Sequence, residues 1–274
     1  MPTLNANDCD FYYEITGTGP DVVFIHGEDH HLDMFQNQIA HFSKRYRCIA
    51  YDRRGHRKSQ LTPFGYSLYN QTLDLTGLLD HLRIQRPVLV AFGMGAPIAT
   101  SFALANPGRV RGLALAARYE LDGYPMMEAQ RRGKHPTTFT KFHMQEFEAL
   151  RDGGPQGLVE FFRKGGDALL PILPAHPELR EQVMHMIASH PPEHFIKAAE
   201  FCTSLPNLTD RLKEITCPIL GICGTEDPSP DNPEQLAGVR NFEQVWIPGS
   251  RRFSMLEEPA AFNAALDRFL GALA

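Results

Sequence analysis

Short apolar runs recur along the chain, and the segments between them carry apolar residues at helical spacing. The runs predict strands at residues 9–16, 21–26, 46–51, 88–91, 112–117, 218–223 and 242–247. Most of these runs are apolar at consecutive positions, which is typical of strands covered on both faces of a sheet. Buried strands that alternate with helices predict an α/β fold with a mostly parallel sheet and helices on both faces.

Helical spacing predicts the elements between and after these strands, at residues 32–44, 70–83, 96–106, 233–238 and 259–273. The alternation stops between residues 121 and 205, where the pattern is helical and no apolar strand run occurs. We therefore expect residues 1–120 and 206–274 to form one core domain, with 121–205 as a helical insertion over one end of the sheet.

The composition of the chain argues against several classes of function. The 274 residues have a formal net charge of −5 and no block of lysines and arginines, which argues against nucleic acid binding. The uncharged stretch 87–105 contains two glycines and a central proline, so it favours a strand, turn and helix over a membrane span. The N-terminus lacks the pattern of a signal peptide, and the five cysteines form no CxxC pair. We expect a cytoplasmic protein with free thiols and no membrane contact.

The stretch 88-VLVAFGMGAP-97 predicts a buried strand that enters a sharp turn before a helix. It is accompanied by 26-HG-27, 51-YDRRGHRKS-59, 224-GTED-227 and 248-PGSRRFSMLEEP-259, in this order. The set resembles the α/β-hydrolase fold with a helical cap, close to the enol-lactonase, haloperoxidase and epoxide-hydrolase branch. The resemblance implies an eight-stranded, mostly parallel sheet flanked by helices, with the cap formed by residues 121–205.

Two members of the family's catalytic triad are absent from the matching positions. The nucleophile of the G-x-S-x-G elbow corresponds to Gly93, and the general base corresponds to Arg252, whose guanidinium stays charged near pH 7. The third member, the acid, corresponds to Asp227. We expect Arg252 to pair with Asp227 as a structural ion pair or to clamp an anionic ligand. Gly93 either only forms the turn, or the space that it leaves above the turn has an active role in the site.

Other parts of the site are expected to persist. The resemblance places the amides of Met94 and Glu28 in an oxyanion hole. In the loop 26-HGEDHH-31, His30 or His31 is a candidate general acid or base, and His26 is a further candidate contact. We expect no metal, because histidine spacing on a loop guarantees no common face. Tyr119, after the strand at 112–117, is a candidate ligand contact or a hinge of the cap.

Three functions are compatible with this pattern. The first is a non-hydrolytic enzyme, of the lyase, cyclase, decarboxylase or isomerase type, acting on a small carbonyl- or carboxylate-bearing molecule. The second is a non-catalytic receptor or pseudoenzyme, and the third is a hydrolase with an unconventional nucleophile. The sequence favours the first of these. We expect a small-molecule ligand and no cofactor, since 93-GMGAP-97 lacks the third glycine of a dinucleotide-binding loop. The sequence is compatible with a homodimer.

Overall fold

The computed structural model of the protein describes residues 3–117, 121, 138–169, 171–228 and 238–273. In this part of the chain, eight strands form one sheet in the order β1-β2-β4-β3-β5-β6-β7-β8. The strands are β1 (Thr3–Ala6), β2 (Cys9–Thr16), β3 (Asp21–Ile25), β4 (Arg47–Tyr51), β5 (Val88–Phe92), β6 (Gly112–Ala116), β7 (Ile219–Gly224) and β8 (Phe242–Ile247). The pairs β1/β2 and β2/β4 are antiparallel and all others are parallel, which confirms the predicted fold class.

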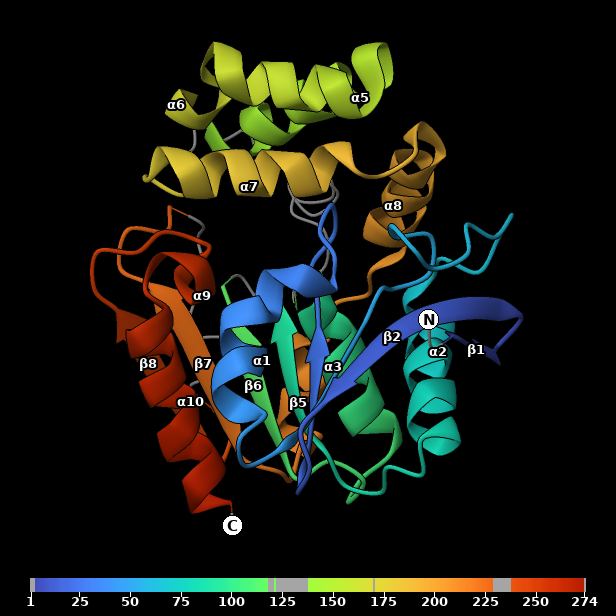
Figure 1. The fold of residues 1–274 in the computed structure, drawn as a ribbon. Helices are drawn as coiled ribbons and strands as arrows, with labels where there is room; N and C mark the ends of the chain where they lie inside the picture. The colour runs from blue at the N-terminus through green and yellow to red at the C-terminus, as the bar shows by residue number, and fades with distance from the viewer. Residues whose placement is uncertain (1–2, 118–120, 122–137, 170, 229–237, 274) are drawn as a thin grey trace.

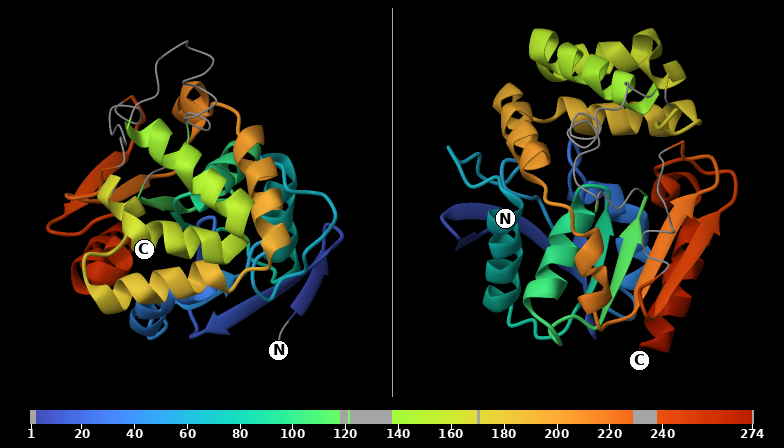
Figure 2. Two further views of the ribbon diagram at one scale, coloured as in Figure 1. Left: turned by 90° about the horizontal axis from the view of Figure 1, so that it is seen from above. Right: turned by 180° about the vertical axis from the view of Figure 1, so that it is seen from behind.

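The central strands are buried because helices cover both faces of the sheet (Figure 1 and Figure 2). Alternate residues of β5 face opposite sides, as strand geometry requires. Val88 and Val90 pack in the core that includes α1 (Gln36–Phe42) and α10 (Pro259–Ala272). Leu89 and Ala91 pack in the core that includes α2 (Leu68–His81) and α3 (Gly95–Ala105).

The helix predicted at 32–44 is divided into two elements. A 3-10 turn, η1 (Leu32–Phe35), comes first, and α1 follows it. The backbone N–H of Leu32 donates to the buried carboxylate of Asp52 at 3.0 Å, which ties the start of this turn to the loop after β4. The short helix α9 (Ser254–Glu257) precedes α10. The helix predicted at 233–238 lies outside the described residues, apart from its last position.

A layer of helices lies above the sheet in Figure 1. It consists of α5 (Thr138–Phe161), the π-helix η2 (Phe162–Gly166), α6 (Asp167–Leu169), α7 (Pro177–Ala188) and α8 (Pro192–Ser204), and the 3-10 helix η3 (Thr209–Glu214) follows it in the chain. We call residues 138–204 of this layer the helical layer. Its helical character agrees with the prediction, whereas the domain boundaries at 121 and 205 stay a prediction. Among the described helices, none is long and apolar enough to cross a membrane.

An ion-pair network fastens the helical layer to the loop after β8. The buried carboxylate of Asp167 accepts hydrogen bonds from Arg180 at 2.8 Å and from Arg251 at 3.3 Å. Arg251 also donates to the carbonyl of Leu173 at 3.0 Å. Nearby, the Glu257 carboxylate accepts from the N–H of Ala175 at 3.3 Å and from the N–H of Arg251 at 2.9 Å.

Candidate active site

The turn between β5 and α3 has the expected elbow shape without a side chain at its apex. Gly93 has a φ of +48°, and its N–H donates to the carbonyl of Ala116 at 3.1 Å. A Cβ built on Gly93 meets no heavy atom within 4 Å, whereas one on Gly95 lies 2.5 Å from the carbonyl oxygen of Ile25. Gly95 therefore allows the close approach of α3 to β3, and Gly93 leaves open space at the apex.

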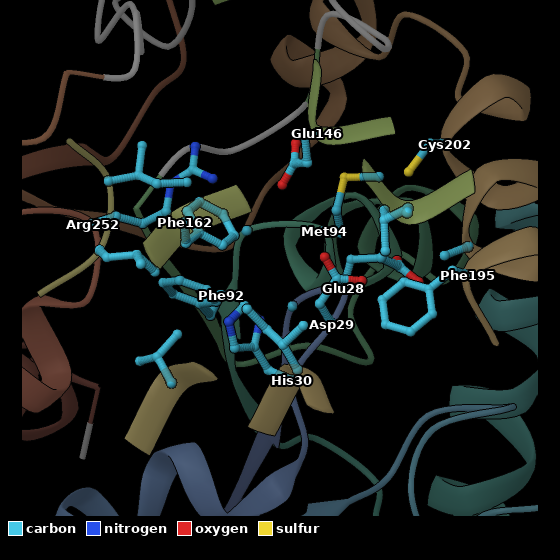
Figure 3. A pocket seen from close by; sticks show the side chains of 18 of the residues that line it. Glu28, Asp29, His30, Phe92, Met94, Glu146, Phe162, Phe195, Cys202 and Arg252 are labelled. Carbon is cyan, nitrogen blue, oxygen red and sulfur yellow. The ribbon is translucent and has the colours of Figure 1, made fainter. Parts of the chain in front are cut away.

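This space is part of a cavity of about 120 Å³ between the sheet and the helical layer (Figure 3). Three loops at the carboxyl edge of the sheet supply its floor: residues 27–30, 92–94 and 252–253. The roof comes from α5, η2, α7 and α8, and Glu146 of α5 contributes a carboxylate to it. Ligands of open α/β sheets bind at this edge. The predicted site residues Glu28, His30, Gly93, Met94 and Arg252 all line the cavity.

Glu28 and Met94, the two residues expected to supply the oxyanion-hole amides, both line the cavity. Met94 directly precedes α3, so its N–H has no acceptor inside the helix and lies at the positive end of the helix dipole. Glu28 follows β3 by three residues, and its carbonyl accepts a hydrogen bond from the N–H of His30. Two amides in these positions form the oxyanion hole of this type of fold.

His30 is an uncharged imidazole in an apolar setting. Its ring packs edge-on against Phe92 and Phe253, with centroids 5.7 and 5.2 Å away. Within the described part of the chain, neither ring nitrogen has a hydrogen-bond partner, and both are buried. Burial, with smaller contributions from neighbouring cationic groups, lowers the pKa of His30 to about 3. The ring therefore offers an unused acceptor inside the cavity at neutral pH.

Arg252 and Asp227 do not both face the cavity. Arg252 lines it, and Figure 3 shows its guanidinium beside Phe162, on the opposite side of the view from Cys202. Asp227 follows β7, is half-buried, and is absent from the described lining residues. The expected pair between Asp227 and Arg252 stays a prediction. It is the neighbouring Arg251 that holds the helical layer through Asp167.

His26 and His31 lie outside the cavity lining. Nδ1 of His26 donates to the carbonyl of Gly27 at 2.7 Å, and Nε2 accepts from the N–H of Arg53 at 2.9 Å. Both nitrogens of His26 are therefore used to shape loops. Nδ1 of His31 lies 3.3 Å from a guanidinium nitrogen of Arg57, beside a different surface hollow. Tyr119 lies outside the described residues.

Several residues in and beside the cavity were not among the predicted site residues. Asp29 lines the cavity, and burial, followed by the neighbouring Glu28 carboxylate, raises its pKa to about 7. His56, His190 and His194 form a buried cluster beside the cavity, with potential ligand atoms within 4.8 Å of one another. The spacing in 190-HPPEH-194 was a usable signal, because two histidines four residues apart flank the start of the helix that the structure shows as α8. The contact with His56 depends on tertiary structure.

A family comparison agrees with this geometry. The model of the alpha/beta hydrolase family matches residues 22–265. The chain is 25% identical to 3-oxoadipate enol-lactonase 2 of Acinetobacter baylyi, over 97% of this chain and 94% of that protein. It is 35% identical to epoxide hydrolase 3 of Siraitia grosvenorii, over 40% of this chain and 36% of that protein.

A solved structure shows the same fold. The thermophilic esterase from Thermogutta terrifontis superimposes with a TM-score of 0.79 at 28% identity, covering 97% of this chain and 94% of the esterase. With a family match over most of its length and an eight-stranded sheet of the expected order, the chain belongs to the alpha/beta hydrolase family.

Proposed function

We propose that the protein is a hydrolase of small esters or lactones that uses a water molecule in place of a side-chain nucleophile. The relatives are named as lactonase, epoxide hydrolase and esterase, so they favour a hydrolase and give no support to the non-hydrolytic enzyme that the sequence favoured. The proposal is one form of the unconventional hydrolase considered as an alternative.

The open space above Gly93 carries this proposal. A serine side chain would occupy that space, and no heavy atom lies within 4 Å of the position of its Cβ. The space faces a cavity whose lining includes Glu28, Met94 and His30. A water molecule held there is in the position from which a hydroxyl would attack a bound carbonyl carbon.

The remaining groups suit acyl transfer to water. The amides of Glu28 and Met94 stabilise the negative charge that develops on the carbonyl oxygen. The imidazole of His30 accepts a hydrogen bond from the water and orients it. The new bond joins the water oxygen to the acyl carbon, the bond to the leaving oxygen breaks, and the proton of the water passes to that leaving oxygen. Arg252 supplies a cationic group for a substrate that carries a carboxylate.

A second candidate function, a non-catalytic receptor for a small anionic ligand, is favoured by one observation. The positions of nucleophile and base hold Gly93 and Arg252, and both line the cavity. A receptor would use the same amides and the same guanidinium, and would release its ligand unchanged.

Hydrolysis of a panel of p-nitrophenyl esters and small lactones, compared between Gly93→Ala and Gly108→Ala, tests the proposal. The methyl group of Gly93→Ala fills the space proposed for the water, so we expect kcat to fall about 10-fold or more. Gly108 is the matched control, because it also has positive φ, at +83°, and no atom within 4 Å of a built Cβ. Equal activity in both variants, or no turnover by the wild type, contradicts the proposal.

A further inference from the structure

Three buried histidines from distant parts of the chain meet beside the cavity. His56 comes from the loop after β4, His190 from the turn between α7 and α8, and His194 from the first turn of α8. The ring centroids of His56 and His194 are 4.3 Å apart, and those of His190 and His194 are 4.4 Å apart. The histidines thus join the helical layer to the core, and none of them lines the cavity.

Backbone carbonyls fix the tautomers of two of the rings, His56 and His194. Nδ1 of His56 lies 2.9 Å from the carbonyl oxygen of Arg54, and Nδ1 of His194 lies 3.1 Å from that of Gly55. Nδ1 of His190 lies 2.9 Å from the carbonyl oxygen of Met186. A carbonyl oxygen only accepts, so Nδ1 of His56 and Nδ1 of His194 carry the hydrogen, and each of these uncharged rings presents a lone pair at Nε2. His190 has a carbonyl oxygen near each nitrogen, so its uncharged ring keeps one lone pair on whichever nitrogen lacks the hydrogen. Metal-binding histidines are oriented in the same way by carbonyl groups.

Each of these lone pairs faces another acceptor. Nε2 of His56 lies 3.4 Å from Oε1 of Glu28, and Nε2 of His194 lies 3.7 Å from Oδ1 of Asp29. The two Nε2 atoms are buried, and neither has a hydrogen-bond partner within the part of the chain that the structure describes. Nε2 of His190 lies 3.2 Å from the carbonyl oxygen of His30. With the hydrogens on Nδ1, the rings of His56 and His194 supply no proton to these gaps.

A bound cation satisfies such a set of acceptors. The alternative is to protonate the rings, which would place several positive charges in a buried cluster that already adjoins Arg53. By contrast, the charge of Arg53 is balanced, since its Nη2 donates to Oε2 of Glu28 at 3.0 Å. His26 is not available as a ligand, because its lone pair at Nε2 already accepts a hydrogen bond from the N–H of Arg53.

We propose that His56, His190 and His194, together with a carboxylate oxygen of Glu28 or Asp29, bind a divalent transition-metal ion of the zinc type. Imidazole nitrogens with one carboxylate are a ligand set that zinc accepts in tetrahedral geometry. The ligand atoms of the three histidines lie within 4.8 Å of one another. Nitrogens around tetrahedral zinc lie about 3.3 Å apart, so binding needs the rings to close by about 1 Å or more. The ion would fasten α8 and the α7–α8 turn to the core.

Metal titration of the whole protein tests the site. The protein is stripped with EDTA, dialysed, and titrated with zinc against a chromophoric chelator and, separately, with cobalt(II) followed by visible absorption. We expect one equivalent of zinc to bind, a higher Tm in its presence, and the intense visible bands of tetrahedral cobalt(II). The variants His190→Gln and His194→Gln should each weaken zinc binding about 10-fold or more.

The control is His41→Gln, because His41 lies on the surface and pairs with Asp267 at 2.7 Å, away from the cluster. Its zinc affinity should equal that of the wild type. If the cluster variants do not fold, the cobalt(II) spectrum and the Tm of the wild-type protein decide the question. Less than one equivalent of tetrahedral cobalt(II) with no change in Tm, or a loss of binding in His41→Gln alone, overturns the proposal.

Discussion

Arg53 donates a hydrogen bond from Nη2 to Oε2 of Glu28 at 3.0 Å, and this ion pair joins the loop after β4 to the loop after β3. The arginine side chain is 1% exposed and also donates two hydrogen bonds to the amide oxygen of Gln71. The loop that carries Glu28 is therefore held in place by a buried guanidinium.

Removing this guanidinium should strongly destabilise the fold. Arg53→Met leaves the Glu28 carboxylate unpaired, and breaking a buried ion pair in this way costs about 3 kcal/mol or more of the free energy of unfolding. Urea unfolding monitored by circular dichroism measures this. Arg47→Met is the matched control, because Arg47 pairs with Asp21 at 3.3 Å with 30% of its side chain exposed, and should cost about 1 kcal/mol or less. A similar loss of unfolding free energy in both variants would contradict the role of Arg53 as the buried partner of Glu28.

The elbow should accept a serine. The wild-type protein should stay unlabelled by serine-directed phosphonate probes, because Gly93 offers no hydroxyl group. The double variant Gly93→Ser with Arg252→His restores a nucleophile and a base at the family's positions, and open space surrounds a Cβ at Gly93. We expect it to label about 100-fold faster than Gly93→Ser alone, which lacks the base. Labelling of the wild-type protein at any serine would contradict the account.

The two adjacent arginines of the loop after β8 should behave differently. Arg252 lines the cavity, so Arg252→Ala should weaken binding of a carboxylate-bearing ligand about 10-fold or more, while Tm stays within a few degrees. Arg251→Ala instead removes the contacts to Asp167 and Leu173, so it should lower Tm and change ligand affinity less. Calorimetric titration and thermal unfolding of both variants test this, and unchanged ligand affinity in Arg252→Ala would contradict it.

The order of strands and helices could be predicted from the sequence, because each central strand is apolar throughout and each flanking helix is apolar on one face. β1 was not assigned to specific residues, since Thr3–Ala6 has only Leu4 as a buried anchor. The elbow at Gly93 and the cavity position of Arg252 followed from motif order. The His56–His190–His194 cluster did not, because it depends on how α8 packs on the loop after β4, a contact between residues more than 130 positions apart.

Acid should destabilise the metal-free protein. Burial lowers the pKa of His30 to about 3 and that of His31, His190 and His194 to about 4. In the unfolded chain these histidines titrate near 6.5, so below that pH they bind more protons there than in the folded chain. Stability is therefore complete above pH 6.5 and is lost as pH falls towards 4, by about 2 kcal/mol for each histidine at pH 5.

Urea unfolding in EDTA at pH 7 and pH 5 measures this loss. The variant His30→Gln lacks one of the titrating groups, so its stability should fall less between the two pH values than that of the wild type. An equal loss of stability in the wild type and in His30→Gln between the two pH values would contradict the burial of His30 in the uncharged form.

The most direct test of the proposed water nucleophile is intact-protein mass spectrometry during turnover. The wild-type protein is mixed with a p-nitrophenyl ester, and samples are quenched with acid from the first turnover onward. The account predicts that the product acid accumulates while the protein mass stays unmodified at every time point. A mass increase equal to one acyl group would reveal a side-chain nucleophile and contradict the claim.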